Sequence, residues 1–97
     1  MSYSLHPQAE QELADAAAFY EERAGAALAR TFLSEFERVA TLLMQNPNLG
    51  TPAEGPYRIY PLRRFPYSVV YRSANEGLRI LVVGHQHRRP SYWRGRG

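Results

Sequence analysis

The stretch FPYSVVYRSANEGLRILVVG, residues 65–84, decides the fold, because it carries two strand patterns joined by a turn. From Phe65 to Tyr71, aromatic and valine side chains recur at every second position, which is the period of a strand with one buried face. In the second part, Leu78, Ile80 and Val82 share one face, and Leu81 and Val83 line the other. We therefore expect this second strand to be central and buried on both sides. The turn signal at residues 74–77 predicts a hairpin between the two strands.

Strand and helix patterns lie upstream of this hairpin. The segment PYRIYPLR predicts a further strand, and Pro61 and Pro66 predict edges or bulges at the strand ends. Apolar residues at three- and four-residue spacing predict two helices before it. Pro7 suits the first helical turn, Gly25 the stop between the helices, and Asn46-Pro47 the end of the second. Residues 3–5 would supply a fourth strand.

Together these elements predict an α+β fold. We expect a short N-terminal strand and a two-helix hairpin packed on a mainly antiparallel sheet of three to four strands. The prediction is a single domain over residues 1–97, with the hairpin at about 7–45, the sheet at about 56–84 and a basic C-terminal tail at 85–97. The chain has no cysteine, no signal-peptide pattern and no apolar run of membrane length. We expect a cytoplasmic protein that has no membrane partner.

The charges divide the chain into two halves. Residues 1–55 carry three arginines against eight acids, a sum of −5, whereas residues 56–97 carry nine arginines against Glu76, a sum of +8. All the basic residues are arginines, which suit bidentate phosphate contacts and stacking on bases. We expect the arginines of the second half to form one basic face with aromatic neighbours, a pattern typical of RNA binding. The alternative is a solvated basic edge that keeps the sheet from pairing with other chains.

The titratable residues carry no fixed-spacing catalytic signature. His85 and His87 alternate at a strand end, but a zinc site needs three or four ligands and the only other histidine is His6. We therefore expect no metal and no cofactor. RNA cleavage needs a base, an acid and cations for the transition state, and His87, Tyr92 and the arginines could supply them.

Four segments in order, HPQAEQELADAAAFYEE, QNPNLG, YRIYPLRRFPYSVVYR and ILVVGHQHRRPSYW, resemble the RelE/ParE family of toxins from bacterial type II toxin-antitoxin modules. The resemblance spans nearly the whole chain. It implies a small toxin that poisons translation or DNA gyrase and that a cognate antitoxin neutralises by wrapping around it. It also implies assembly as a homodimer or as a toxin-antitoxin heterotetramer.

The resemblance leaves the target open between two branches of the family. Arg58 and Tyr92 match positions of RelE-like members, which cleave mRNA on the ribosome, but Ser68 and Gln86 stand where those enzymes commonly carry basic residues. The segments SVVYR and VVGH and the long helical hairpin resemble ParE-like members, which block gyrase. We favour the ParE-like toxin. The alternatives are a ribosome-dependent, metal-independent mRNA endonuclease and a non-toxic basic RNA-binding module.

Each functional hypothesis assigns roles to particular residues. An endonuclease would use Arg58, His87 and Tyr92 in catalysis. Contact with the target, whether gyrase, ribosome or mRNA, is predicted at Arg58, Arg63, Arg64, Arg88, Arg89 and Arg94. Antitoxin binding is predicted on apolar residues of the helical hairpin, namely Tyr20, Leu28, Phe32 and Phe36. Trp93 is expected to tether the tail to the core by burial.

Overall fold

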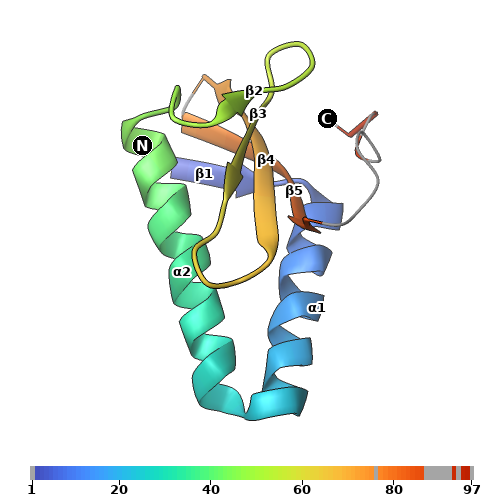
Figure 1. Ribbon diagram of the computed structural model, residues 1–97. Coiled ribbons are helices and arrows are strands. Elements are labelled where there is room, and N and C mark those ends of the chain that lie inside the picture. Colours follow the sequence, from blue (N-terminus) through green and yellow to red (C-terminus); the bar gives the residue numbers. More distant parts are fainter. Residues whose placement is uncertain (1, 76, 87–92, 94, 97) are drawn as a thin grey trace.

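The computed structural model describes residues 2–75, 77–86, 93, 95 and 96. The elements in chain order are β1 (Ser2–Leu5), α1 (Pro7–Ala24), α2 (Ala26–Gln45), β2 (Thr51–Pro52), β3 (Arg58–Pro61), β4 (Tyr67–Ala74) and β5 (Gly77–His85). The strands form one sheet in the order β1-β5-β4-β3-β2, in which β1 runs parallel to β5 and the other pairs are antiparallel. Figure 1 shows the two helices as a long hairpin beside this sheet. The predicted α+β architecture is confirmed.

The sheet has one strand more than the sequence predicts. β2 lies in the segment expected to be a loop, where Thr51 pairs with Ile59 and Pro52 with Arg58. A strand of two residues is too short to show a period, and this one contains a proline, which is tolerated at a sheet edge. β5 lies between β1 and β4, so its predicted central position is confirmed.

The helices begin and end where the sequence predicts. Pro7 occupies the first turn of α1, and the Nδ1 atom of His6 caps the helix by accepting a hydrogen bond of 3.1 Å from the Gln8 amide. Gly25 alone separates α1 from α2, at a φ of 93° that side chains rarely adopt. Neither helix in the described part of the chain is long and apolar enough to cross a membrane.

The main core lies between the helices and one face of the sheet. Phe32 is fully buried, and its ring meets those of Phe65 and Tyr20 with centroids 5.2 and 5.3 Å apart. A smaller cluster on the opposite face consists of Val70, Leu81, Val82 and Trp93, with Ala53 and Tyr57 beside it. Trp93 is only 6% exposed and packs edge-on against Tyr57. The predicted tether between the tail and the core is therefore confirmed.

A β-bulge corrects the predicted faces of β5. Val70 pairs with Val82 and Tyr71 with Ile80, so that Leu81 is an extra residue without a partner in β4. Beyond the bulge the alternation reverses. Val82 joins Leu81 on the Trp93 side, and Val83 packs in the main core, which is the opposite of the prediction from strict alternation. The irregularity lies here rather than at Pro61 or Pro66.

Candidate interaction surface

The arginines of the strands do not form the single basic face that we expected. Arg58 pairs with Tyr71, whose side chain faces the helices. Arg72 and Arg79 pair with each other, and each alternates with residues of the main core, so both lie on the opposite face. The prediction was wrong because it grouped strand residues by sequence segment and ignored which face each position takes.

Arg58 holds the loop between α2 and β2. One guanidinium nitrogen donates hydrogen bonds to the carbonyl oxygens of Gly50 at 2.8 Å and Asn48 at 3.3 Å. The Tyr71 hydroxyl accepts from the Gly50 amide at 2.9 Å and donates to the Pro47 carbonyl at 2.7 Å. Burial raises the pKa of Tyr71, which keeps its hydroxyl protonated as a donor. Arg58 is half-buried, and these contacts direct its charge toward the backbone of its own chain.

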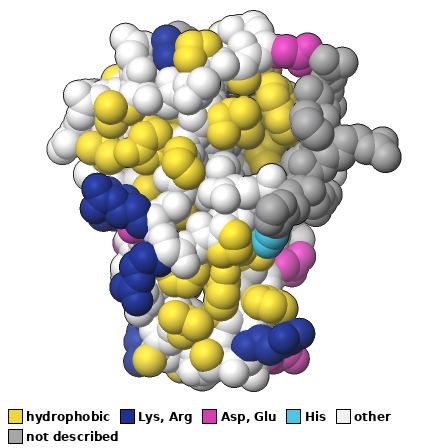
Figure 2. All heavy atoms as spheres, in the orientation of Figure 1, with side chains coloured by type: hydrophobic (Ala, Val, Ile, Leu, Met, Phe, Trp, Pro, Cys, Tyr) yellow, Lys and Arg dark blue, Asp and Glu magenta, His cyan; other side chains and the backbone are white. Residues whose placement is uncertain are grey.

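Arg63 and Arg64 lie in the loop between β3 and β4, beside α2. The Arg63 amide donates to Glu35 Oε2 at 2.6 Å, and Arg38 donates to both Glu35 oxygens at 2.8 and 2.9 Å. The hydrogen bond from Arg38 holds the pKa of Glu35 below its ordinary value. Both loop arginines are exposed, so the structure does not favour one over the other as a contact. Figure 2 shows basic side chains along the α2 edge of the molecule.

The predicted tail residues His87, Arg88, Arg89, Tyr92 and Arg94 lie outside the described residues. The described residues on either side of them are firmly bonded. The Gln86 amide donates to the Pro66 carbonyl at 2.8 Å, and Trp93 is buried. The described neighbours Gln86 and Trp93 thus both contact the sheet or the loop that precedes β4.

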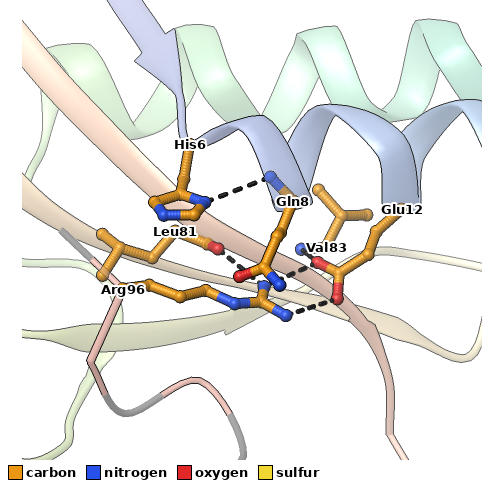
Figure 3. A network of polar contacts seen from close by, with 6 residues as sticks. All are labelled: His6, Gln8, Glu12, Leu81, Val83 and Arg96. Atoms are coloured by element: carbon orange, nitrogen blue, oxygen red, sulfur yellow. Dashed lines mark hydrogen bonds and ion pairs between the residues drawn. The ribbon is translucent and has the colours of Figure 1, made fainter.

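Arg96 makes a contact that the sequence did not predict. Its guanidinium donates two hydrogen bonds of 3.0 Å to Glu12 of α1 and one of 2.9 Å to the Leu81 carbonyl (Figure 3). Glu12 in turn accepts from the Val83 amide at 3.1 Å. These backbone groups of β5 lie beyond the last pairing with β1, at Ile80, so the ion pair satisfies them where β1 has ended. Glu12 and Arg96 lie 84 positions apart, and no local pattern links them.

The residues predicted to bind an antitoxin lie mostly inside the protein. Phe32 and Phe36 belong to the buried core, and Tyr20 and Leu28 are half-buried against it. The accessible apolar surface of the hairpin is instead a groove of about 570 Å³ between α1 and α2, lined largely by alanines with Leu13 and Leu33. Outside the groove, large exposed apolar side chains include Phe19, Leu49 and Ile59. Figure 2 shows further hydrophobic surface over the end of the molecule where β2 and β3 lie.

His85 packs against an aromatic ring. Its ring lies edge-on to that of Tyr67, with centroids 5.4 Å apart, at the end of β5. Within the described ranges, no three histidine, aspartate or glutamate side chains come together as a metal-binding group. The arrangement that the described residues do offer is a set of arginines and apolar side chains suited to contact with another macromolecule.

Comparison with known proteins first defines the class of fold. A chain of the "Chromosomal ParDE TA system from P. aeruginosa" superposes with a TM-score of 0.74 over 88% of this chain and 95% of that one, at 24% identity. The same architecture therefore occurs in a toxin-antitoxin protein. Residues 3–90 match the family model described as "ParE toxin of type II toxin-antitoxin system, parDE". Toxin ParE2 of Mycobacterium tuberculosis, from strains CDC 1551 and H37Rv, is 31% identical over 87 residues, which cover 90% of this chain and 83% of the relative. The chain belongs to the ParE family of type II toxins.

Proposed function

We propose that the chain is a cytoplasmic toxin that arrests bacterial growth by inhibiting DNA gyrase and that a cognate antitoxin neutralises. The match to the ParE family over residues 3–90 carries this proposal. It supports the ParE-like branch of the two that the sequence left open, and the resemblance to that branch implies gyrase as the target.

The contacts of Arg58 support the gyrase target over mRNA cleavage. A ribonuclease needs cations aimed at the phosphate as charge develops on it. The Arg58 guanidinium is engaged with the carbonyls of Asn48 and Gly50, and Ser68 supplies no cation on β4. In this proposal Arg58 is a positioning residue that holds the loop.

In this proposal, the exposed arginines of the β3–β4 loop and the arginines of the C-terminal tail contact the target. We assign Arg63 and Arg64 to this role, together with Arg88, Arg89 and Arg94 of the tail. The burial of Trp93 and the Glu12–Arg96 pair support the assignment, because they fix two described residues of the C-terminal segment on the sheet and on α1. Antitoxin binding is assigned to the groove between α1 and α2, which Leu13 and Leu33 help to line, in place of the buried or half-buried residues that the sequence suggested.

The proposal is tested with purified gyrase, relaxed plasmid and ATP. Adding the chain should abolish supercoiling, and induced expression in bacteria should lower thymidine incorporation before amino-acid incorporation. An early collapse of protein synthesis with intact supercoiling would instead establish a ribosome-directed toxin. Normal growth together with normal supercoiling would support the third alternative, in which the chain is a non-toxic RNA-binding module.

The role of the tail is tested by the double variant Arg88→Ala/Arg89→Ala. It should lose gyrase inhibition while keeping the far-ultraviolet circular dichroism of the parent. The matched control is Arg23→Ala, an exposed arginine on α1 that packs on Phe19 away from the sheet. Full inhibition by the soluble double variant would remove the tail arginines from the contact surface.

A further inference from the structure

A small hollow between α2 and the β3–β4 loop gathers three arginines. It encloses about 230 Å³ and is lined by Thr31, Ser34, Glu35 and Arg38 of α2 and by Arg63, Arg64 and Phe65 of the loop. We call these residues the basic notch. The lining contains three arginines and one carboxylate, which leaves two positive charges in excess.

The carboxylate of the notch is already saturated. Arg38 occupies both oxygens of Glu35, and the Arg63 amide takes a further bond to one of them. Among the described residues, the guanidinium groups of Arg63 and Arg64 make no hydrogen bond or ion pair. Two exposed arginines therefore line the same hollow, and Glu35 does not occupy their guanidinium groups.

The loop is held rigidly in the conformation that presents these cations. Phe65 is buried between Tyr20 and Phe32, and the Leu62 amide donates to the Tyr67 carbonyl at 2.9 Å. Arg64 has a φ of 70°, in the left-handed region that a non-glycine residue adopts only at a cost. A strained φ at a non-glycine residue marks Arg64 as a candidate functional position. Because the loop is already ordered, binding does not have to order it.

The surroundings of the notch favour a short partner over a long polyanion. Along α2, which forms one wall of the notch, Glu35 and Glu37 balance Arg30 and Arg38, so the basic hollow does not continue into a basic helix. A nucleic acid carries phosphates along its whole length and needs an extended basic track. A small basic hollow of this volume fits a few carboxylates, which arginine binds through paired hydrogen bonds.

We infer that the basic notch binds a short acidic segment of a protein partner, whose aspartate or glutamate carboxylates pair with Arg63 and Arg64. The inference rests on the proposed function in one respect. Arg63 and Arg64 were assigned there to contact with the target, and the inference gives them a carboxylate-bearing protein partner. Thr31 and Ser34 line the same hollow and add hydroxyl groups to its wall.

The test measures binding to the full chain by fluorescence anisotropy of a labelled short peptide rich in glutamate. Two further labelled ligands are compared with it: the same peptide with glutamine in place of glutamate, and a short DNA duplex. Arg63→Gln/Arg64→Gln should weaken binding of the glutamate peptide by about tenfold or more. Arg23→Gln on α1 is the matched control for loss of a positive charge and should change binding by less than about twofold. Amide chemical shifts of the parent should move at residues 31–38 and 62–66 on peptide addition.

A second variant separates binding from the shape of the loop. Arg64→Gly relieves the left-handed φ, so it should raise the urea midpoint while it lowers affinity for the glutamate peptide. Four results would each overturn the inference: no binding by the parent, unchanged binding by the notch variants, an equal loss in the Arg23→Gln control, or a loss confined to the DNA duplex. Supercoiling by gyrase is not used in this test, so the inference and the proposed function can fail separately.

Discussion

At the scale of single residues, Tyr71 shows how one buried hydroxyl organises a surface loop. Its ring lies in the main core, while its hydroxyl exchanges hydrogen bonds with Pro47 and Gly50 at the start of the sheet. Arg58 reaches the same loop from the neighbouring strand. The sequence marks these residues separately, as an aromatic strand position, a loop and a candidate catalytic arginine. Only the pairing of Arg58 on β3 with Tyr71 on β4 shows that both residues hold the loop between α2 and β2.

Glu35 is expected to stabilise the fold in a pH-dependent way. The hydrogen bond from Arg38 is the largest influence that lowers its pKa from the ordinary value of 4.5. A carboxyl whose pKa is lower in the folded state stabilises above the unfolded pKa, and this contribution disappears as pH falls through the folded pKa. Glu35→Gln should therefore lower the free energy of unfolding by about 1 kcal/mol at pH 6 and by much less at pH 3. Urea denaturation at the two pH values measures the difference.

The control for this prediction is Glu37→Gln, which removes an exposed carboxylate two positions along α2. It accounts for the effect of one negative charge on the same helix. Identical pH profiles for the two variants would show that Arg38 and Arg63 do not stabilise Glu35 in solution.

At the scale of elements, two glycines occupy the connections before and after α2 for different reasons: Gly25 directly precedes the helix, and Gly50 directly precedes β2. Gly25 needs its positive φ, and a Cβ atom there would meet nothing within 4 Å. A Cβ atom on Gly50 would lie 2.6 Å from the Tyr71 hydroxyl and 3.0 Å from the Ile59 carbonyl. The first glycine serves backbone conformation, and the second allows the loop to approach the sheet.

This difference predicts that a substitution at Gly50 is energetically coupled to Tyr71, whereas a substitution at Gly25 is not. Gly25→Ala and Gly50→Ala should each cost roughly 1–3 kcal/mol of unfolding free energy. Combined with Tyr71→Phe, Gly50→Ala should cost less than the sum, because both changes disturb the same contact. Gly25→Ala should be additive with Tyr71→Phe, since α2 has 20 residues and separates the sites by about 30 Å. Urea denaturation of the single and double variants measures the coupling, and additivity at Gly50 would contradict the contact.

The elements that the sequence predicts are those with a local signal. Pro7, Gly25 and the helical spacing define the hairpin, and the alternation from Phe65 to Tyr71 defines β4. The bulge at Leu81 has no such signal, because a run of apolar residues fits either face. It arises from pairing with β4, and it reverses the faces of Val82 and Val83. Short β2 likewise depends on its partner β3 and not on its own sequence.

At the scale of the whole molecule, the sequence predicted that the candidate interaction surface is rich in arginine, but not which residues pair on it. The excess of arginine in the second half of the chain pointed to the tail and to Arg63 and Arg64. The sequence did not reveal that Arg38 of the acidic half completes a notch with them, or that Glu12 of α1 pairs with Arg96. Both pairings join segments that are distant in the chain, so they follow from the packing of the hairpin on the sheet.

The Glu12–Arg96 pair is expected to fasten the C-terminal segment to the sheet. The two side chains are 19% and 10% exposed, so removing one partner leaves the other charge poorly solvated. Arg96→Gln and Glu12→Gln should each destabilise by about 2–3 kcal/mol, and the double variant should fall short of the sum by at least about 1 kcal/mol. Trp93, the sole tryptophan, reports the local consequence.

If the pair fastens the segment, Arg96→Gln should shift the emission of Trp93 to longer wavelength in native buffer while the circular dichroism of the helices stays unchanged. Trp93 packs on Tyr57, Val70 and Leu81, so its release exposes the indole to water without opening the main core. Arg72→Gln, which removes a charge from the same face of the sheet, is the control and should leave the emission in place. An unshifted spectrum in Arg96→Gln would mean that burial of Trp93 alone fastens the segment and that Arg96 serves only the backbone groups at the bulge.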